Sequence, residues 1–340
     1  MREEEAGALP GLFLSTLSSV YSSGLRLRSL LYRSGFRRTK RLPCRVISVG
    51  NLTVGGTGKT PVTIHIAEFL KKNNARPVIL SRGYKGSSKG VTVVSDGKGI
   101  LAEPKEAGDE PYLMAERLKS VPVITGADRY RAGLYAIDKF SPDVIILDDG
   151  FQHIRLERDV NILLVDSTEG FGNGRLLPRG VLREPVEAVR RADLIMVKDG
   201  TGEFLKGYNL PVFEFSYRPL ALRDMDNAIE AGLNFIAGKK VIAIAGIANP
   251  SSFFKSLARL NANVVRTVSF PDHHGYTSPD INGIRALSKE AQLIITTEKD
   301  GVKLKGQSLG LPAFSLSIDV DVKDMEKFHA LILPPRRAER

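Results

Sequence analysis

The residues best suited to chemistry form a glycine-rich run that ends in a lysine and a threonine. They lie between an apolar segment and a segment with helical spacing, and they are Gly55, Gly56, Thr57, Gly58, Lys59 and Thr60. A strand, a glycine turn, Gly-Lys-Thr and a helix make up a phosphate-binding loop. The glycines let backbone N–H groups surround phosphate oxygens, and the helix N-terminus adds partial positive charge. Lys59 is then placed to contact the outer phosphates, and the Thr60 hydroxyl to bind Mg²⁺.

Two alternatives to a phosphate-binding loop stay open. The consensus begins with a glycine at the position of Thr53, so the run is also compatible with a glycine-rich turn that carries Lys-Thr by chance. A dinucleotide-binding fingerprint fits less well, because Pro61 stands where its third glycine is expected.

The second candidate is an apolar run that ends in two carboxylates. Asp148 and Asp149 follow the run 144–147, and Gln152 and His153 come shortly after them. In nucleotide-binding folds of this kind, a carboxylate at the end of a strand lies beside the Mg²⁺ ion. Alone, Asp-Asp-Gly is typical of a turn; together with the glycine-rich run it favours a magnesium site, with either carboxylate as the ligand. His153 is either structural or orients Asp149 or a phosphate.

A third candidate is the acidic start of a helical segment, Gly108-Asp109-Glu110-Pro111. Asp109 suits a helix N-cap, or else a base that accepts the proton of an attacking hydroxyl. An unperturbed aspartate is a weak base at neutral pH, so a histidine partner would help. Two candidate partners, His273 and His274, occur in a polar segment far along the chain. The alternative is that this segment is an ordinary polar loop whose histidines take no part in the reaction.

Short apolar runs alternate with helical segments from residue 45 onward, which predicts parallel sheets covered on both faces. The expected strands are Val46–Val49, Val78–Ser81, Val121–Ile124, Val144–Leu147, Val160–Val165, Leu194–Val197, Val241–Ala245, Val264–Val268 and Leu293–Thr296. The expected helices are Pro61–Lys72, Pro111–Lys119, Arg129–Phe140, Ser251–Leu260 and Pro279–Lys289. The pattern is weakest over 201–239, where we place the domain junction. We therefore expect a helical segment over 1–44, a nucleotide-binding domain over 45–215 and a second, smaller α/β domain over 216–335, before a solvated basic tail.

Charge is unevenly distributed along the chain of 340 residues, whose formal net charge is +11. No acidic residue occurs from Ala6 to Ala67, and this part begins with an amphipathic helical pattern followed by arginines. Such a helix either lies on an anionic membrane surface or packs on its own domain. No stretch has the roughly 20 apolar residues that span a bilayer. The single cysteine, Cys44, excludes a disulfide framework and a multi-cysteine metal site and indicates a reducing compartment.

Two function classes other than a phosphate-transferring enzyme share some features of the sequence. A nucleic-acid-binding protein is suggested by the net charge, but the chain has no recognition motif and no basic patch interleaved with aromatic residues. A GTPase switch would carry Asn-Lys-x-Asp, and Thr297-Glu298-Lys299-Asp300 is similar but lacks the asparagine.

Taken together, the motifs resemble the tetraacyldisaccharide 4′-kinase family, the lipid A 4′-kinases of Gram-negative bacteria. The segments that carry the resemblance are 49–61, Ser-Arg-Gly-Tyr (81–84), Gly-Asp-Glu-Pro (108–111), Asp-Asp-Gly-Phe-Gln-His (148–153), Leu-Arg-Glu-Pro (182–185) and Phe-Pro-Asp-His (270–273). They occur in the family's order over about residues 10–300, and the glycine spacing is the family's own.

The resemblance implies an atypical P-loop kinase that uses ATP and Mg²⁺. Its reaction would transfer the γ-phosphoryl group to the 4′-hydroxyl of a tetraacylated disaccharide 1-phosphate lipid. The enzyme would associate peripherally with the anionic cytoplasmic face of the inner membrane, and the sequence indicates no protein partner or nucleic acid.

The resemblance also assigns residues to roles. Asp109 would be the base with His273 as its partner, while His274 remains an alternative partner. Lys59 would act on the phosphates as a catalytic residue within the loop. Nucleotide contacts would come from the loop 55–60 together with Gln152, His153 and Arg183. The metal ligands would be Thr60 and one or both of Asp148 and Asp149.

Overall fold

A computed structural model describes residues 2–84, 86–87, 90–227 and 229–333, and side chains from residue 14 onward. The tail predicted from residue 334 lies outside the described residues. The strands are β1 (Arg45–Asn51), β2 (Pro77–Ser81), β3 (Val91–Asp96), β4 (Pro122–Gly126), β5 (Val144–Asp148), β6 (Val160–Asp166), β7 (Leu194–Lys198), β8 (Val212–Asp224), β9 (Glu230–Ala231), β10 (Lys240–Ala245), β11 (Asn263–Ser269), β12 (Leu293–Thr297) and β13 (Ala313–Val322). The helices are α1 (Arg2–Arg33), α2 (Lys59–Lys72), α3 (Pro104–Ala107), α4 (Asp109–Arg117), α5 (Arg129–Phe140), α6 (Pro250–Arg259), α7 (Ser278–Ala286), α8 (Glu298–Leu304) and α9 (Met325–Ile332).

The strands of the described residues join into one 13-stranded sheet with the order β11-β10-β12-β13-β8-β7-β6-β1-β5-β2-β4-β3, while β9 pairs with β8. Neighbouring strands are parallel except for β3 with β4, β8 with β13, and β8 with β9. In the middle of the larger lobe, Ile47 of β1 pairs with Ile146 of β5 and Val160 of β6. The predicted α/β class with a mainly parallel sheet is confirmed.

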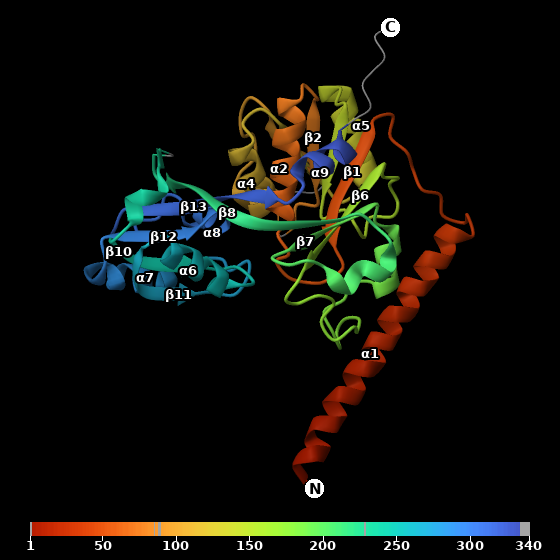
Figure 1. The fold of residues 1–340 in the computed structure, drawn as a ribbon, viewed down its shortest axis with the longest axis horizontal. Coiled ribbons are helices and arrows are strands. Elements are labelled where there is room, and N and C mark those ends of the chain that lie inside the picture. The colour runs from red at the N-terminus through yellow and green to blue at the C-terminus, as the bar shows by residue number, and fades with distance from the viewer. Residues whose placement is uncertain (1, 85, 88–89, 228, 334–340) are drawn as a thin grey trace.

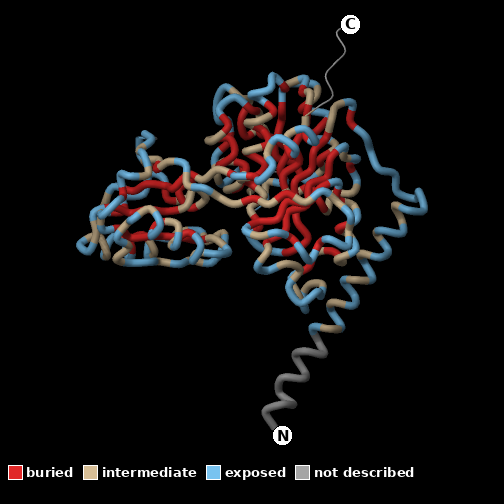
Figure 2. The backbone as a smooth tube through the Cα atoms, in the orientation of Figure 1, coloured by how far each residue is buried: buried red, intermediate tan, exposed pale blue. Residues whose placement is uncertain are grey.

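Helices cover both faces of the sheet in the larger lobe, and the strands between them are buried (Figure 2). On one face, Ile47 and Val49 of β1 pack in a cluster with apolar residues of α2, α4 and α9. On the other face, Val46 belongs to a cluster that includes α5. Burial of successive residues on opposite faces gives a continuous apolar run instead of an alternating one.

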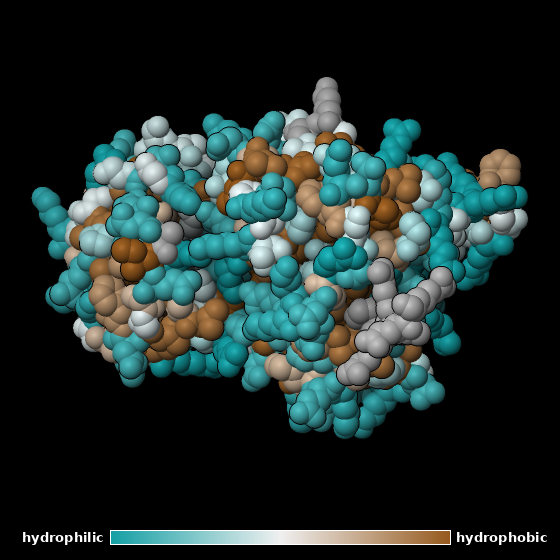
Figure 3. All heavy atoms as spheres, turned by 90° about the horizontal axis from the view of Figure 1, so that it is seen from above, coloured by the Kyte–Doolittle hydropathy of each residue, from teal (hydrophilic) through white to brown (hydrophobic). Residues whose placement is uncertain are grey.

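The smaller lobe repeats this arrangement with β10, β11, β12 and part of β13. Val241, Ala243 and Ala245 of β10 pack with Phe253 and other apolar residues on the side of α6. The intervening residues of β10 pack with Ile281 and Ile284 of α7 on the opposite side. Hydrophilic side chains gather where the two lobes meet on the face shown in Figure 3.

Two long antiparallel strands connect the lobes, and both were missed in the sequence. β8 leaves the larger lobe beside β7 and continues into the smaller lobe, where it pairs with β13 along its length (Figure 1). The domain boundary expected between residues 215 and 216 therefore falls inside β8. The lobes share a continuous sheet, and the proposed division into domains stays a prediction.

Helix α1 extends past the edge of the larger lobe (Figure 1). Three of its side chains contact one segment of that lobe: Ser18 donates a hydrogen bond to the Leu176 carbonyl (3.0 Å), Tyr21 donates one to the Arg183 carbonyl (2.8 Å), and Arg28 pairs with Glu184. Large apolar side chains of α1 remain exposed, including Leu17, Val20, Leu27 and Leu30. Among the described residues, no helix has the length and apolar character needed to cross a membrane.

Candidate active site

The glycine-rich run forms the turn between the end of β1 and the start of α2. Gly58 has φ +82° and directly precedes Lys59, the first residue of α2. Glycine adopts this left-handed backbone without the steric penalty that other residues incur. The first N–H groups of α2, which have no partners within the helix, therefore open onto the turn, as they do in a phosphate-binding loop.

A tyrosine of β8 occupies the space that a side chain on Gly58 would need. A Cβ atom placed on Gly58 would lie 1.2 Å from the hydroxyl oxygen of Tyr217. Part of the tyrosine is exposed, but its hydroxyl is buried and has no hydrogen-bond partner among the described residues. Burial raises the pKa of Tyr217 far above its ordinary value. A Cβ on Gly56 would likewise lie 3.2 Å from Cβ of Ala248 in the smaller lobe. The connecting strand and the smaller lobe thus pack against the loop.

Lys59 extends from the loop toward the carboxyl ends of β1 and β5. Its Nζ lies 3.4 Å from Oδ1 of Asn51 and 3.8 Å from Oδ1 of Asp149. Thr60 is buried, and so is the hydroxyl of Thr57, which has no hydrogen-bond partner among the described residues. Because buried hydroxyls are normally hydrogen-bonded, Thr57 has capacity for an additional polar group, such as a phosphate oxygen.

Asp148 is the last residue of β5 and is buried. Its carboxylate accepts hydrogen bonds from the hydroxyls of Thr63 (3.3 Å) and Ser81 (3.1 Å). Burial, together with the negative charges of Glu110 and Asp149, raises the pKa of Asp148 to about 7. Within the described part of the chain, no basic side chain forms an ion pair with Asp148. A cation beside this carboxylate would supply the charge that its burial leaves uncompensated.

Asp149 has a different environment, although it is the next residue. Arg183 donates two hydrogen bonds to its carboxylate, at 2.9 and 3.0 Å. Burial acts to raise the pKa of Asp149, but Lys59 and Arg183 outweigh it and hold that pKa below its usual value. Asp149 also has φ +50°, a strained backbone for a residue with a side chain. Two adjacent carboxylates thus have opposite pKa shifts, which is common at functional sites.

Gln152, His153 and Arg183 lie at the same end of the sheet. Gln152 and Arg183 each donate a hydrogen bond to the Asn51 carbonyl, at 2.8 and 3.0 Å. Burial and the nearby Arg129 lower the pKa of His153 to about 4, which keeps its ring neutral at physiological pH. Asn51, which contacts Lys59, Gln152 and Arg183, was missed in the sequence; its position at the end of the strand before the glycine turn was the available signal.

Asp109 and His273 come from different lobes and lie close together. Nδ1 of His273 is 3.6 Å from Oδ2 of Asp109. Burial acts to raise the pKa of Asp109, but His273, Lys303 and Lys299 together hold it below its ordinary value. Asp109 is the first residue of α4, and Gly108 occupies the N-cap position. The alternative role of Asp109 as a helix N-cap is therefore wrong.

His274 is directed elsewhere. Its Nε2 lies 3.0 Å from Oδ2 of Asp280 in α7, and its ring stacks on Phe270. Of the two histidines considered as partners, the structure places His273, not His274, beside Asp109. Glu110 links this pair to the end of β5, because it lies 3.9 Å from Nε2 of His273 and also raises the pKa of Asp148.

The oxygen atoms near the loop suit Mg²⁺ better than a transition metal. Among the described residues, no group of three or more histidine, cysteine, aspartate or glutamate side chains could hold a metal by itself. Protein sites for Mg²⁺ commonly provide one or two carboxylates, with substrate phosphates and water completing the octahedron. The Thr60 hydroxyl and the buried, uncompensated Asp148 carboxylate fit that description.

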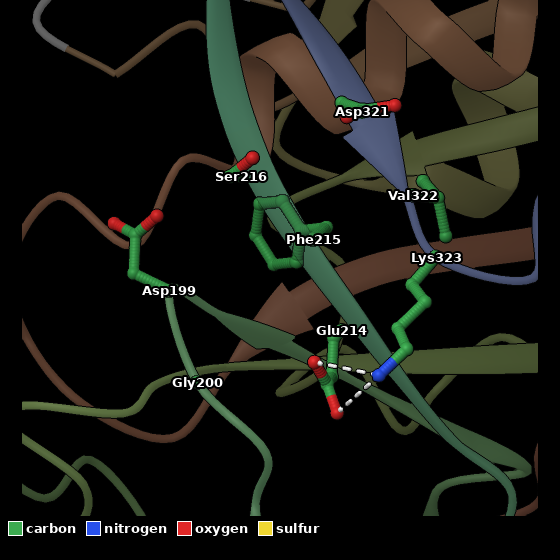
Figure 4. Close-up of a pocket in the computed structure, with 8 residues that line it drawn as sticks. All are labelled: Asp199, Gly200, Glu214, Phe215, Ser216, Asp321, Val322 and Lys323. Carbon is green, nitrogen blue, oxygen red and sulfur yellow. Dashed lines mark hydrogen bonds and ion pairs between the residues drawn. The ribbon is translucent and has the colours of Figure 1, made fainter.

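A separate pocket lies where β7, β8 and β13 meet (Figure 4). Asp199, Glu214, Ser216 and Asp321 line it, and Lys323 pairs with Glu214 at 3.5 Å. It contains none of the candidate site residues, so the chemistry predicted from the motifs lies outside this pocket.

Comparison with known proteins gives one consistent result. The family model for tetraacyldisaccharide-1-P 4′-kinase matches residues 11–335. The chain is 45% identical to the tetraacyldisaccharide 4′-kinase of Syntrophus aciditrophicus, over 95% of this chain and 92% of that protein. It is 40% identical to the one from Aquifex aeolicus, over 94% and 97% of the two chains. A crystal structure of the "apo" form of LpxK from Aquifex aeolicus in complex with ATP superimposes with a TM-score of 0.79 at 39% identity, covering 95% of this chain and 98% of that one.

Proposed function

This chain belongs to the tetraacyldisaccharide-1-phosphate 4′-kinase family, and on that basis we propose how its own residues carry out the transfer. The protein is an ATP-dependent kinase that phosphorylates the 4′-hydroxyl of a tetraacyldisaccharide 1-phosphate. The assignment of residues rests on the proximity of three groups. Lys59 of the glycine loop lies 3.8 Å from Asp149 at the acidic end of β5. Glu110 lies 3.9 Å from His273, the partner of Asp109, and its charge also acts on Asp148 of β5.

The nucleotide binds with its phosphates in the loop 55–60. Backbone N–H groups at the start of α2 and the Thr57 hydroxyl, which is unpaired among the described residues, donate to phosphate oxygens. Lys59 neutralises charge on the outer phosphates, and Arg183 with Gln152 fixes the end of β1 beside them. Because phosphoryl transfer involves little covalent chemistry by the protein, such positioning and charge neutralisation dominate catalysis.

Thr60 and Asp148 would hold Mg²⁺, with Asp149 at the same strand end. A magnesium ion held there would supply positive charge against the negative charge that develops on the phosphate oxygens. Asp148 suits this role better than Asp149, because Arg183 already compensates the charge of Asp149 on both oxygens. Binding of the cation would lower the pKa of Asp148 and keep its carboxylate ionised.

Asp109 accepts the proton of the 4′-hydroxyl. The hydroxyl oxygen forms a bond to the γ-phosphorus while the bond from that phosphorus to the β,γ-bridging oxygen breaks, and ADP leaves. Asp109 is ionised at neutral pH, because His273, Lys303 and Lys299 hold its pKa below the ordinary value. As a weak base, it accepts the proton only as the new bond to phosphorus forms. His273, whose Nδ1 lies 3.6 Å from Oδ2 of Asp109, orients this carboxylate.

The enzyme reaches its lipid substrate at a membrane surface through α1. Each acyl CH₂ group of the substrate adds about 0.8 kcal/mol of burial, which keeps the lipid in the bilayer. Exposed apolar side chains on α1 and the arginines that follow it supply apolar area and charge for an anionic surface, here the cytoplasmic face of the inner membrane. The contact between Tyr21 and the Arg183 carbonyl connects this helix to the nucleotide site.

Substitution of Asp109 tests the assignment of the base. We expect Asp109→Ala and Asp109→Asn to lower kcat by about 10²-fold or more while the KM for ATP changes little, since the base acts mainly in the transition state. Asp138→Asn, an exposed carboxylate of α5, is the matched control and should leave both constants unchanged. Near-normal turnover of both Asp109 variants would rule out this role.

A further inference from the structure

We propose that Lys299 is a positioning residue that fixes the proton of His273 on Nδ1, so that Asp109 alone accepts the substrate proton. This inference rests on the proposed function, because it explains how the Asp109–His273 pair is organised. Lys299 lies in the segment Thr297-Glu298-Lys299-Asp300, which resembles a guanine-reading motif only in part and has no role in the nucleotide site described above.

Three partners surround the ammonium group of Lys299. Nζ lies 3.0 Å from Nε2 of His273, 3.0 Å from Oδ1 of Asp272 and 3.4 Å from Oε1 of Glu110. The side chain is only 16% exposed. A lysine ammonium has three hydrogens and no acceptor capacity, so these contacts account for all three of its donors.

The contact with His273 has a direct consequence for the imidazole. Because an ammonium group only donates, the ring nitrogen facing it must accept, and Nε2 therefore carries no hydrogen. In a neutral ring the hydrogen is then on Nδ1. Nδ1 is the nitrogen that faces Asp109, at 3.6 Å. A small approach of the two lobes would bring this N–H into hydrogen-bond range of the carboxylate.

This arrangement also determines which group takes the proton. Protonation of His273 on Nε2 would place an N–H against the ammonium of Lys299, so the ring cannot take up a second proton while that contact persists. The ring can only donate to Asp109, and the carboxylate remains the acceptor. Among the described residues, the charged or aromatic side chains that face the ring include Asp109 and Glu110 of α4, Asp272 of the preceding loop, Lys299 of α8, and Tyr84. Lys303 of α8 lies 3.9 Å from Asp109.

The start of α8 is held firmly enough to position a lysine. Thr297 caps the helix by accepting a hydrogen bond from the Asp300 N–H, at 3.1 Å. Asp300 is fully buried and accepts hydrogen bonds from the Gly246 N–H (2.8 Å) and the Thr297 hydroxyl (2.7 Å). Lys303 pairs with Asp300 at 3.0 Å one turn later. The Thr-x-Lys-Asp segment thus anchors the helix through its threonine and aspartate and directs its lysine to His273.

The position of the hydrogen can be measured without any assay of activity. Full-length protein labelled with ¹⁵N-histidine gives ring nitrogen shifts that distinguish a protonated from an unprotonated nitrogen, and His273→Gln identifies the signals of His273. We expect Nδ1 protonated and Nε2 unprotonated in the unaltered protein. Lys299→Met should remove this bias, and Lys299→Arg should largely retain it. Lys305→Met, at the residue directly after the end of α8, is the control and should leave the signals of His273 unchanged.

Steady-state kinetics provide a second measurement, which distinguishes a positioning role of Lys299 from a purely structural one. Lys299→Met should lower kcat by about 10- to 10²-fold with little change in the KM for ATP, as other orienting groups do.

Either of two results would overturn the inference: Nε2 protonated in the unaltered protein, or an unchanged hydrogen position in Lys299→Met. If Lys299→Met does not fold, the measurement on the unaltered protein and on Lys299→Arg still decides the question. A failure of the proposed function is a different result, in which Asp109→Ala retains turnover while the hydrogen on His273 is found on Nδ1.

Discussion

Replacement of Gly58 by alanine tests whether the connecting strand β8 packs on the phosphate loop. The new Cβ atom would lie 1.2 Å from the Tyr217 hydroxyl oxygen and 2.5 Å from Cζ of the ring. Alanine at the left-handed φ of +82° costs about 1–2 kcal/mol, and overpacking adds about 1–3 kcal/mol. We therefore expect Gly58→Ala to reduce the free energy of unfolding by about 2–5 kcal/mol, measured by urea denaturation of the nucleotide-free protein.

The contribution of the clash is separated by a double-mutant cycle. Tyr217→Ala removes the clashing atoms, so Gly58→Ala should cost about 1–3 kcal/mol less in that background. Tyr217→Phe should relieve less of it, because Cζ remains. Gly306→Ala is the matched control, since Gly306 has φ +74° and no atom within 4 Å of the new Cβ, so it should show the backbone cost alone. If the effects of Gly58→Ala and Tyr217→Ala simply add, the packing of β8 on the loop is refuted.

Three further predictions concern the loop, the N-terminal helix and a half-buried histidine. Lys59→Ala should lower the rate of transfer by about 10²-fold or more through lost stabilisation of phosphate charge, and a variant that retains most activity in a steady-state assay would contradict the phosphate-loop assignment. Deletion of residues 1–36 should weaken cosedimentation with anionic vesicles while ATP binding persists, and equal sedimentation of the two proteins would argue against the role of α1. Burial and His65 lower the pKa of His329 to about 4. The unfolded chain therefore takes up this proton first, and stability falls as the pH drops from about 6.5 toward 4. His329→Phe should flatten that fall in urea titrations, and an unchanged pH dependence would count against it.

Strands buried on both faces were predictable, and strands at the lobe connection were not. β1, β5 and β10 are continuous apolar runs because both of their faces pack against other residues. β8 mixes buried and exposed positions and includes Pro219, while β13 combines apolar residues with Asp319 and Asp321. Such mixed patterns occur where a strand leaves one core for another, and local periodicity does not distinguish them from a loop.

The residues of the candidate site also differ in whether the sequence could predict them. Residues within one continuous motif, such as Lys59 and Asp148, could be found from their spacing after a strand. Tertiary contacts bring Glu110 of α4, Lys299 of α8 and Tyr217 of β8 to the site. The spacing of residues in the sequence does not encode such contacts. Glu110 follows Asp109 directly, so its charge was the one visible signal.

The most direct test of the account is the fate of the γ-phosphoryl group. Purified protein is incubated with γ-labelled ATP, Mg²⁺ and the tetraacyldisaccharide 1-phosphate lipid in vesicles, in parallel with Lys59→Ala and Asp109→Asn. We predict a labelled lipid that carries a second phosphate on its 4′-oxygen, formed by the unaltered protein and reduced about 10²-fold or more in both variants. Label that appears only in inorganic phosphate, or an equal yield from Asp109→Asn, would contradict the account.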